Sequence, residues 1–311
     1  ATILGPIVIP FLRRLKVGQT EREELESHQI KTGTPTMGGL IILAAIVITS
    51  LFYVLRYPKI IPIVFLTVGF GVIGFLDDYL KVVLRRSDGL LAWQKMLLQI
   101  VVTTIFAVYL VRYTDVSLTM LVPFSGGHYI DLGWLAIPLM YFAVIGTVNG
   151  VNFTDGLDGL TGGVTLIVAA FFMIVSWAAG SMISPVCGAI VGALLAFLLF
   201  NCYPAKVFMG DTGSLALGGF VAATAFVLKM PIFIVIVGFV YLWESITVML
   251  QVGWFKITKR KYGEGRRLFK MAPFHHHLEQ CGWRETKVVT LFYVVTALLC
   301  LLGFLGSKAM F

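Results

Sequence analysis

Charged residues are scarce in this chain of 311 residues, where they make up 13% of the sequence against 58% for hydrophobic residues. An average soluble domain is about 25% charged and about 45–50% apolar. The mean hydropathy of +0.91 points the same way. The composition therefore excludes an ordinary soluble domain and indicates a polytopic membrane protein.

Cysteine clusters and sequence repeats are also missing. The four cysteines, at positions 187, 202, 281 and 300, show no CxxC spacing, and three of them fall in or at the ends of apolar segments. This pattern supports neither a zinc site nor a disulfide framework. No repeat or Pro/Ser-rich linker divides the chain, and no cleavable signal peptide is visible. We therefore expect a single integral membrane domain over residues 1–311.

Long apolar runs are abundant instead. A helix needs about 20 apolar residues to cross a bilayer. Runs of about this length occur at residues 37–57, 60–80, 92–112, 134–151, 160–179, 182–203, 214–230, 231–255 and 286–307. A shorter apolar start at residues 1–12 is typical of the end of a further helix. The sequence thus predicts an all-α polytopic membrane protein with about ten transmembrane helices.

The basic residues predict the orientation of these helices. Lys and Arg gather in alternate loops, above all at residues 13–31, 81–95 and 256–287. Because cytoplasmic loops are enriched in Lys and Arg, these loops are predicted inside and both termini outside. The one sizeable outward segment, residues 114–133, has two β-prone runs around a Ser-Gly-Gly turn, so we expect a short outward-facing β-hairpin there.

The acidic residues converge on the predicted cytoplasmic face. Three separate parts of the chain place carboxylates at cytoplasmic helix ends, namely Asp77, Asp78, Asp155, Asp158 and Asp211. Carboxylates beside hydrocarbon are expensive, and most of them are functional. Their strongly basic surroundings suit a substrate with two or three negative charges.

The segment GFLDDYLK, residues 74–81, holds the first two of these acids. Asp77 and Asp78 are neighbours on a helix and point about 100° apart, so they cannot bind one ion in the same way. Lys81 lies one turn further on and can neutralise either of them. A polar helix end paired with lysine is therefore the alternative to a functional site.

The segment NFTDGLDGL, residues 152–160, holds the next two. Asp155 and Asp158 are three residues apart and share one face of a helical turn. Gly156 and Gly159 permit close approach of a ligand, and Asn152 adds an oxygen donor. Asp158 is also a sound N-cap for the helix that follows, which explains one aspartate but not both.

Two further segments have the composition of phosphate-binding sites. In VFMGDTGSLALGG, residues 207–219, a Gly-Asp-Thr-Gly-Ser run ahead of an apolar helix is predicted to present free N–H groups to phosphate, with Asp211 beside them for a metal. Simple capping by Asp211 or Ser214 is the alternative. In MAPFHHHLEQCGW, residues 271–283, consecutive histidines cannot all face one metal, so we favour phosphate contact over a surface turn.

Hard oxygen ligands with basic residues around them are typical of a magnesium site shared with a diphosphate. The corresponding reaction class is phosphoryl transfer, in which a protein mainly positions groups and offsets charge. A site at the membrane surface implies one soluble and one lipid-borne substrate.

Taken in order along the chain, GTPTMGG (residues 33–39), GFLDDYLKV, NFTDGLDGL, YPAKVFMGDTGSLALGG and MAPFHHHLEQCGW resemble the bacterial phospho-N-acetylmuramoyl-pentapeptide transferases. This family belongs to the polyprenyl-phosphate N-acetylhexosamine-1-phosphate transferases. The resemblance implies a Mg²⁺-dependent enzyme of the bacterial inner membrane with its active site on the cytoplasmic face. The implied reaction moves phospho-MurNAc-pentapeptide from UDP-MurNAc-pentapeptide to undecaprenyl phosphate, giving lipid I and UMP. A homodimer and no nucleic-acid partner are expected.

The resemblance also implies roles for individual residues. It makes Asp211 the magnesium ligand, places Asp77 and Asp78 beside the reacting phosphates, and assigns Asn152, Asp155 and Asp158 to the nucleotide. Phe208 is expected to stack on uracil. The resemblance also makes His276 a catalytic residue, together with Asp77, Asp78 and Asp211. Further substrate-binding positions are Lys31, Thr36, Lys81, Lys95, Asn201, Gly210, Ser214, Gln251, His275 and His277.

Two other functions remain open at this stage. A sibling transferase would use another UDP-N-acetylhexosamine, although the HHH segment is typical of the MurNAc-pentapeptide branch. An ion-coupled transporter would also carry intramembrane acids, but these acids gather at one face rather than at mid-membrane. Glu244 lies inside an apolar segment, and we expect it to be paired within the bundle or to line a lipid groove rather than to relay protons.

Overall fold

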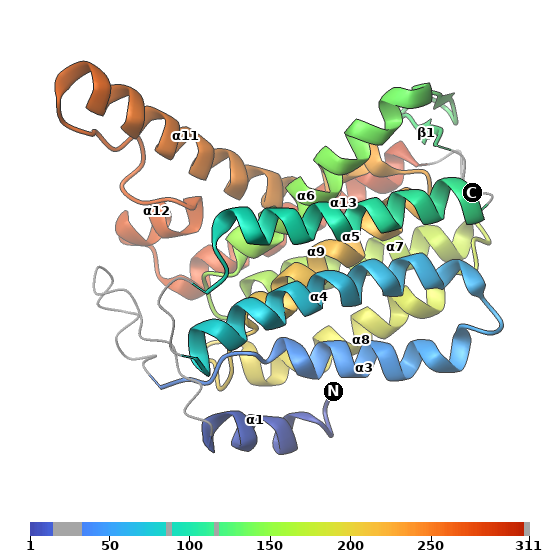
Figure 1. Ribbon diagram of the computed structural model, residues 1–311, viewed down its shortest axis with the longest axis horizontal. Coiled ribbons are helices and arrows are strands. Elements are labelled where there is room, and N and C mark those ends of the chain that lie inside the picture. The colour runs from blue at the N-terminus through green and yellow to red at the C-terminus, as the bar shows by residue number, and fades with distance from the viewer. Residues whose placement is uncertain (15–32, 85–88, 115–117, 308–311) are drawn as a thin grey trace.

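The computed structural model describes residues 1–14, 33–84, 89–114 and 118–307. Most of its helices run nearly side by side in one bundle (Figure 1). They are α1 (Gly5–Arg14), α3 (Gly39–Tyr53), α4 (Ile61–Val82), α5 (Ala92–Tyr113), α6 (Ala136–Thr154), α7 (Leu160–Ala178), α8 (Ser184–Asn201), α9 (Gly210–Val227), α10 (Ile234–Val237), α11 (Phe239–Tyr262), α12 (Phe274–Gln280) and α13 (Glu285–Gly306). Short 3₁₀ turns η1 (Pro58–Ile60), η2 (Gly133–Leu135) and η3 (Pro231–Phe233) precede α4, α6 and α10.

Each predicted apolar segment contains a helix, so the all-α membrane class is confirmed. Within the described residues, however, six helices are long and apolar enough to cross a membrane, or seven if α10 and α11 form one bent span. The helix α3 has 15 residues and α1 has 10, which is short for a full crossing. The predicted number of about ten spans therefore exceeds what helix length and apolarity support.

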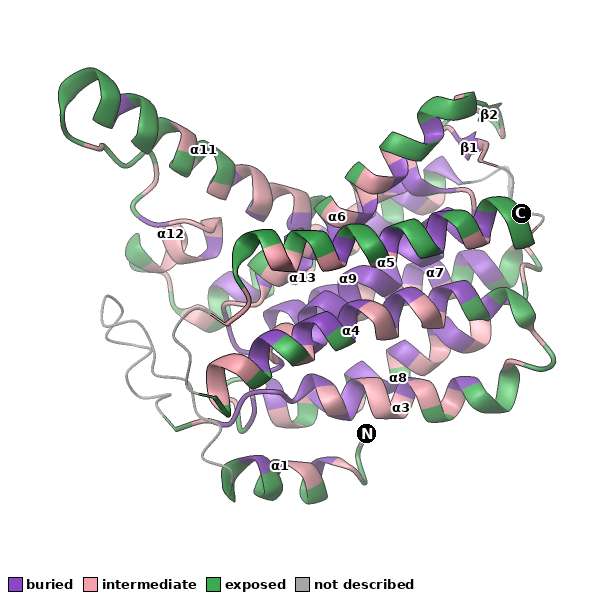
Figure 2. Ribbon diagram, in the orientation of Figure 1, coloured by how far each residue is buried: buried purple, intermediate pink, exposed green. Residues whose placement is uncertain are grey.

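Helix α9 forms the centre of the bundle, where buried residues are concentrated (Figure 2). Every residue from Thr212 to Val227 is buried, as expected of a helix that is apolar on all sides. At Gly74 of α4 a side chain would collide with the backbone of Asp211 and Thr212. This glycine lets the two helix backbones touch, which brings the acids of α4 next to the start of α9.

The outer helices combine a lipid-compatible face with a polar inner face. On α5, side chains such as Leu97, Val101 and Val108 are exposed, while Gln99 is buried. Gln99 exchanges two amide hydrogen bonds with Asn149 of α6, at 2.8 and 3.3 Å. In a bilayer, where exposed apolar side chains meet lipid, such paired amides hold neighbouring helices together.

The segment predicted as one apolar helix at residues 231–255 is instead broken. Helix α10 ends at Val237, and α11 leaves it at an angle of 79°. Gly238 stands at the break, where a glycine tolerates the close approach of the preceding turn. Helix α11 consequently projects from the bundle, with the short α12 lying beside its middle and its far end exposed (Figures 1 and 2).

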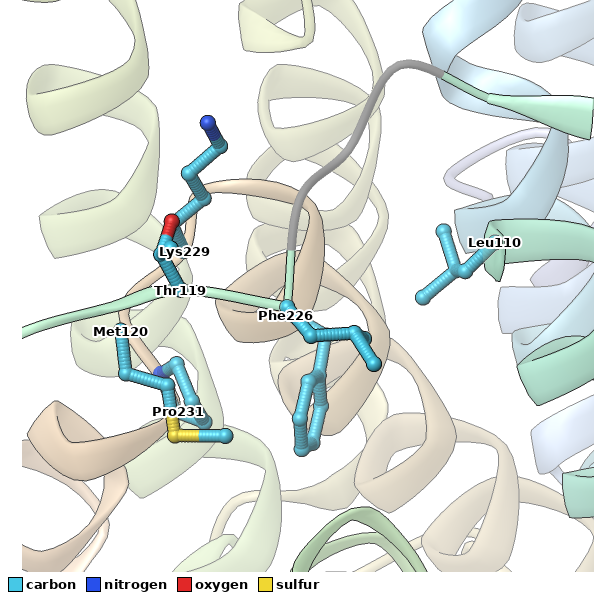
Figure 3. Close-up of a pocket in the computed structure, with 7 residues that line it drawn as sticks. Leu110, Thr119, Met120, Phe226, Lys229 and Pro231 are labelled. Carbon is cyan, nitrogen blue, oxygen red and sulfur yellow. The ribbon is translucent and has the colours of Figure 1, made fainter. Parts of the chain in front are cut away.

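Two short antiparallel strands lie next to the C-terminal end of α9, where the Leu121 N–H donates to the Lys229 carbonyl. The strands β1 (Met120–Leu121) and β2 (Tyr129–Ile130) pair with Met120 opposite Ile130. The placement of this pair on the outer membrane surface stays a prediction. A cavity of about 10 Å³ lies nearby, between the side chains of Leu110, Met120, Phe226 and Lys229 (Figure 3). It has room for about one water molecule, so it is no substrate site.

Candidate active site

The candidate site is built around Asp211, in the first turn of α9. Its Oδ2 accepts hydrogen bonds from the ammonium groups of Lys95 at 2.9 Å and Lys81 at 3.2 Å. The carboxylate keeps 18% of its surface exposed, and the two lysines keep 19% and 33%. The cluster is therefore anchored in the bundle yet open to a ligand.

Asn152, in the last turn of α6, holds the other oxygen of this carboxylate. Its Nδ2 donates to Oδ1 of Asp211 at 2.8 Å and to Oγ of Ser214 at 2.9 Å. The Ser214 hydroxyl in turn donates to the carbonyl of Gly210 at 3.1 Å. Three predicted site positions thus converge on Asp211, and the hydrogen bonds fix the orientation of its carboxylate.

Asp77, in the last two turns of α4, faces the same lysines. Its Oδ2 pairs with Lys81 at 2.7 Å and lies 3.5 Å from Nζ of Lys95, while its Oδ1 accepts the N–H of Leu90 at 2.7 Å. The two lysines therefore bridge Asp77 and Asp211. Because each lysine is shared between two carboxylates, the cluster can rearrange around an incoming anion without leaving a charge unpaired.

Asp78 plays a different part, as the angular separation of the two aspartates predicts. It is buried and accepts hydrogen bonds from the backbone N–H of Asp211 at 3.1 Å and of Thr212 at 2.9 Å, and from the Thr212 hydroxyl at 2.6 Å. Helix α9 begins at Gly210, so these groups belong to its first turn. The expectation of free N–H groups in this run is wrong for these two residues, because a carboxylate from α4 already caps them.

The NFTDGLDGL segment turns the chain from α6 into α7. Gly159, with a positive φ of 78°, is the N-cap of α7, so Asp158 does not cap it. The buried Asp158 instead accepts the N–H of Ala205 at 2.9 Å, and Asn201 accepts the N–H of Gly159 at 3.2 Å while donating to the Val207 carbonyl at 2.9 Å. Asp158 and Asn201 thus join this turn to the segment that leads to Phe208.

Asp155 is half-buried at the end of α6, beside the cluster. Burial, together with the negative charges of Asp211 and Asp78, raises the pKa of its carboxyl to about 8. Ionisation of Asp155 is therefore costly in the ligand-free protein. A cationic ligand would lower that cost.

The GTPTMGG segment lies against the start of α9. The N–H groups of Gly38 and Gly39 donate to the carbonyls of Phe208 and Met209 at 2.9 and 2.8 Å, and the Phe208 N–H donates to the Pro35 carbonyl at 2.8 Å. The Thr36 hydroxyl is buried next to Gly210 and has no partner among the described residues. Lys31 lies outside the described residues. Thr36, Phe208 and Gly210 therefore gather near Asp211.

The HHH segment forms α12, and its three rings point to different partners. His275 is buried and lies 3.2 Å from Oε2 of Glu244, so Glu244 is paired within the bundle, as expected. Nδ1 of His276 lies 2.8 Å from Oε2 of Glu279, and Nδ1 of His277 accepts the N–H of Lys270 at 3.2 Å.

Gln251 lies further along α11 and closes the basic loop. Its Oε1 accepts the N–H groups of Leu268 and Phe269 at 3.0 and 2.9 Å, and its Nε2 donates to the Phe269 carbonyl at 3.1 Å. In the ligand-free protein this side chain therefore holds residues 268–269 of the loop against α11. The next residue, Lys270, contacts His277 of α12.

Three contacts of the site involve residues that the sequence did not single out. Thr212 binds Asp78, Glu285 accepts the N–H of Asp158 at 2.8 Å, and the Tyr293 hydroxyl donates to the Gly159 carbonyl at 2.7 Å. Glu285 and Tyr293 belong to α13, more than a hundred positions away from their partners. Sequence spacing carries no signal for such contacts, although an acid at the start of an apolar helix is a weak one.

The donor set suits Mg²⁺ better than a softer metal. Within the described residues no three His, Cys, Asp or Glu side chains are grouped as a complete metal site. Mg²⁺ usually takes only one or two carboxylates and fills its remaining positions with phosphate oxygens and water. Asp211, partly exposed and next to Asp77, meets that requirement once a diphosphate supplies the other ligands.

Comparison with known proteins agrees with this geometry. The bundle and its charged cluster define a membrane-embedded transferase, and the model of glycosyl transferase family 4 matches residues 60–229. A signature of the phospho-N-acetylmuramoyl-pentapeptide-transferases matches residues 31–43. The transferase of that name from Acetivibrio thermocellus is 49% identical over 99% of this chain and 92% of its own. Those from Clostridium novyi and Caldicellulosiruptor bescii are 48% and 47% identical over 98% and 97% of this chain, and 92% of each relative. The chain belongs to the phospho-N-acetylmuramoyl-pentapeptide-transferase family.

Proposed function

We propose that this protein transfers phospho-MurNAc-pentapeptide from UDP-MurNAc-pentapeptide to undecaprenyl phosphate, giving lipid I and UMP. The observation that carries the proposal is the cluster in which Asp211 meets Lys81, Lys95 and Asn152. Two lysines shared between carboxylates offer the positive charge that a diphosphate and a second phosphate need when they are brought together. The family membership supplies the identity of the two substrates.

In this reaction an oxygen of undecaprenyl phosphate attacks the β-phosphorus of the nucleotide sugar. The bond between that phosphorus and the oxygen of the α-phosphate breaks, and UMP leaves. Asp211, with Asp77 beside it, would hold Mg²⁺, which neutralises charge on the diphosphate when bound. Lys81 and Lys95 can turn from the carboxylates to the phosphates and keep the two anions in line.

The acceptor attacks directly rather than through a phosphoryl-enzyme. A phosphate monoester has a second pKa near about 6, so undecaprenyl phosphate is already an anion at neutral pH. Asp77, whose Oδ2 is paired with two lysines, is suited to orienting the acceptor or taking its remaining proton. A covalent route would let labelled UMP exchange into UDP-MurNAc-pentapeptide in delipidated enzyme. The direct route requires undecaprenyl phosphate for that exchange.

The nucleotide binds on the side of Asp155, Asp158 and Phe208. Asp158 and Asn201 join the 155–159 turn to the segment that ends at Phe208. The Phe208 ring is half-buried, which leaves a face for uracil. Thr36, Gly210 and Ser214 border the diphosphate, and His275, His276, His277 and Gln251 extend the binding surface toward the sugar and peptide.

The proposed setting is the bacterial inner membrane, with about ten spans, the site on the cytoplasmic face, both termini and the β1–β2 hairpin outside, and a homodimeric assembly. The basic loops support this orientation. A cysteine at Ser125 should react with an impermeant thiol reagent from outside, whereas one at Gly263 should not. The opposite labelling pattern would invert the proposed topology.

The test of the function is UMP release by purified protein given undecaprenyl phosphate and one nucleotide sugar at a time. We expect release with UDP-MurNAc-pentapeptide and only background with UDP-N-acetylglucosamine. Release with UDP-N-acetylglucosamine alone would identify a sibling transferase. Nucleotide-sugar flux into liposomes without any lipid product would identify a transporter.

A further inference from the structure

The contact between Glu244 and α12 is not explained by the proposed reaction. Glu244 lies in the second turn of α11, just beyond the 79° bend, and both its side chain and that of His275 are fully buried. One oxygen, Oε2, accepts the N–H of Phe274 at 2.8 Å and lies 3.2 Å from Nδ1 of His275. A single carboxylate oxygen thus holds the first turn of α12.

The other side of the His275 ring faces the nucleotide side of the site. Nε2 of His275 lies against Gly156, so closely that a side chain at position 156 would collide with it. Neither this nitrogen nor Oε1 of Glu244 has a hydrogen-bond partner among the residues that the structure describes. The ring is therefore a spacer between Glu244 on α11 and the turn that carries Asp155 and Asp158.

Aromatic contacts fix α12 to α11 independently of this pair. The ring of Phe274 packs edge to face with the rings of Trp243 and Phe269, with centroid-to-centroid distances of 5.6 and 6.2 Å. These contacts already secure the short helix, so anchoring it does not require a buried carboxylate. A charge is costly to bury and is kept where it has a specific task.

We propose that Glu244 is a positioning residue, which sets the His275 ring against Gly156 and thereby fixes the 155–159 turn for the uridine diphosphate end of the substrate. As a carboxylate, Glu244 only accepts hydrogen bonds, so Oε2 receives Nδ1–H of His275 as well as the Phe274 N–H, and Nε2 of the ring is directed at the turn. Asp77, which we propose for the acceptor phosphate, bonds to Lys81 and to the Leu90 N–H instead of to this ring. The inference rests on the proposed function, because it requires the transfer reaction as its readout.

The experiment measures both KM values of the transfer reaction in purified variants, together with their melting temperatures. Glu244→Gln keeps the length of the side chain and an acceptor for Phe274, but loses the charge. We expect it to raise the KM for UDP-MurNAc-pentapeptide about tenfold, since a hydrogen bond to a charged group is lost, and to leave the KM for undecaprenyl phosphate unchanged. Thr296→Val, on α13, is the control: Thr296 is buried, and its hydroxyl donates to the carbonyl of Phe292 in its own helix, away from Glu244 and His275, so neither KM should move.

Gly156→Ala tests the other side of the ring without touching Glu244. Its added methyl group must displace His275, so it should give the same selective rise in the nucleotide KM. Gly146→Ala, on the helix α6 that precedes this turn but in open space, should have no effect. In a His275→Asn background, Glu244→Gln should add no further change, since it acts through the ring.

Either of two results would overturn the inference. In the first, Glu244→Gln and His275→Asn have multiplicative effects. In the second, the variants have a lower melting temperature and a smaller fraction of active enzyme, while both KM values stay as in the wild type. If the wild-type protein releases no UMP at all, the proposed function fails instead, so the two failures are distinguishable.

Discussion

The side-chain amide of Asn152 donates to Oδ1 of Asp211 at 2.8 Å and so joins the end of α6 to the first turn of α9. The opposite oxygen of the same carboxylate receives Lys95 and Lys81. One side of Asp211 is thus held by a neutral donor that also binds Ser214, and the other by cations that can move to a substrate. This asymmetry is what prepares the carboxylate for a metal and a diphosphate.

Replacing Asn152 with Leu should therefore impair transfer more than folding. The change keeps the approximate size of the side chain but leaves Oδ1 of Asp211 without its donor, at a cost of about 1–3 kcal/mol. We expect kcat/KM to fall roughly 10- to 100-fold. Asn149→Leu, one turn earlier on α6, is the control, because it breaks the pair with Gln99 and should lower the melting temperature without changing activity per folded molecule. Equal effects of both variants on kcat/KM would contradict the role of Asn152.

Asp78→Ala should act mainly on stability. It strips three donors from the start of α9, two of them backbone N–H groups in a buried position. Unsatisfied buried donors cost about 1–3 kcal/mol each, so we expect a loss of roughly 3 kcal/mol or more and a clear drop in melting temperature. Asp131→Ala removes an exposed carboxylate that accepts only the Gly133 N–H and should change stability by less than about 1 kcal/mol. A melting temperature that is unchanged in Asp78→Ala would show that α9 is not capped in this way.

Phe208→Ala should raise the KM for the nucleotide sugar more than it lowers kcat. The stacking on uracil that we propose for Phe208 would stabilise the ground and transition states equally, which is the pattern of uniform binding. The backbone hydrogen bonds of residue 208 to Pro35 and Gly38 persist in alanine, so the local fold should survive. Phe142→Ala, which removes an exposed ring from α6, serves as the control. An unchanged KM for the uridine substrate would remove Phe208 from the site.

Asp155 should make stability depend on pH in the absence of Mg²⁺ and nucleotide. Its pKa rises from an ordinary value of 3.8 to about 8 because of burial. Between these values the folded protein binds more protons than the unfolded one, so stability is fully present below about pH 4 and is lost as pH rises through about 8. The melting temperature of the wild type should fall over this interval relative to that of Asp155→Asn. Parallel curves for the two proteins would rule out this titration.

The helices could be predicted from the sequence because hydropathy is a local property. Each apolar run contains a helix, and the sequence also predicts the acids at one face. The break at Gly238 was not predicted, because the apolar run continues through it and a single glycine is not enough to predict a bend of 79°. Helix α9 also begins four residues earlier than its apolar run, since Asp78 of α4 stabilises a first turn that hydropathy does not include.

The site could be predicted as a set of residues but not as a set of contacts. The partners Asn152 and Asp211 are 59 positions apart, and Asp78 and Thr212 are 134 apart, so no periodicity links them. Capping of α7 by Asp158 was the alternative to a functional role, and Asp158 instead binds the Ala205 N–H across the turn. Which of several similar carboxylates faces the lysines and which supports a helix depends on how α4, α6 and α9 pack, and this packing is settled by glycines such as Gly74.

The most direct test of the account is the transfer activity of Asp211→Asn. The amide keeps the size of the carboxylate but loses the charge that pairs with Lys81 and Lys95 and that we propose to hold Mg²⁺. We expect UMP release from UDP-MurNAc-pentapeptide and undecaprenyl phosphate to fall to background at saturating Mg²⁺, in a protein that elutes and melts as a folded species. Near-normal turnover of this variant would contradict the claim that the cluster around Asp211 is the active site.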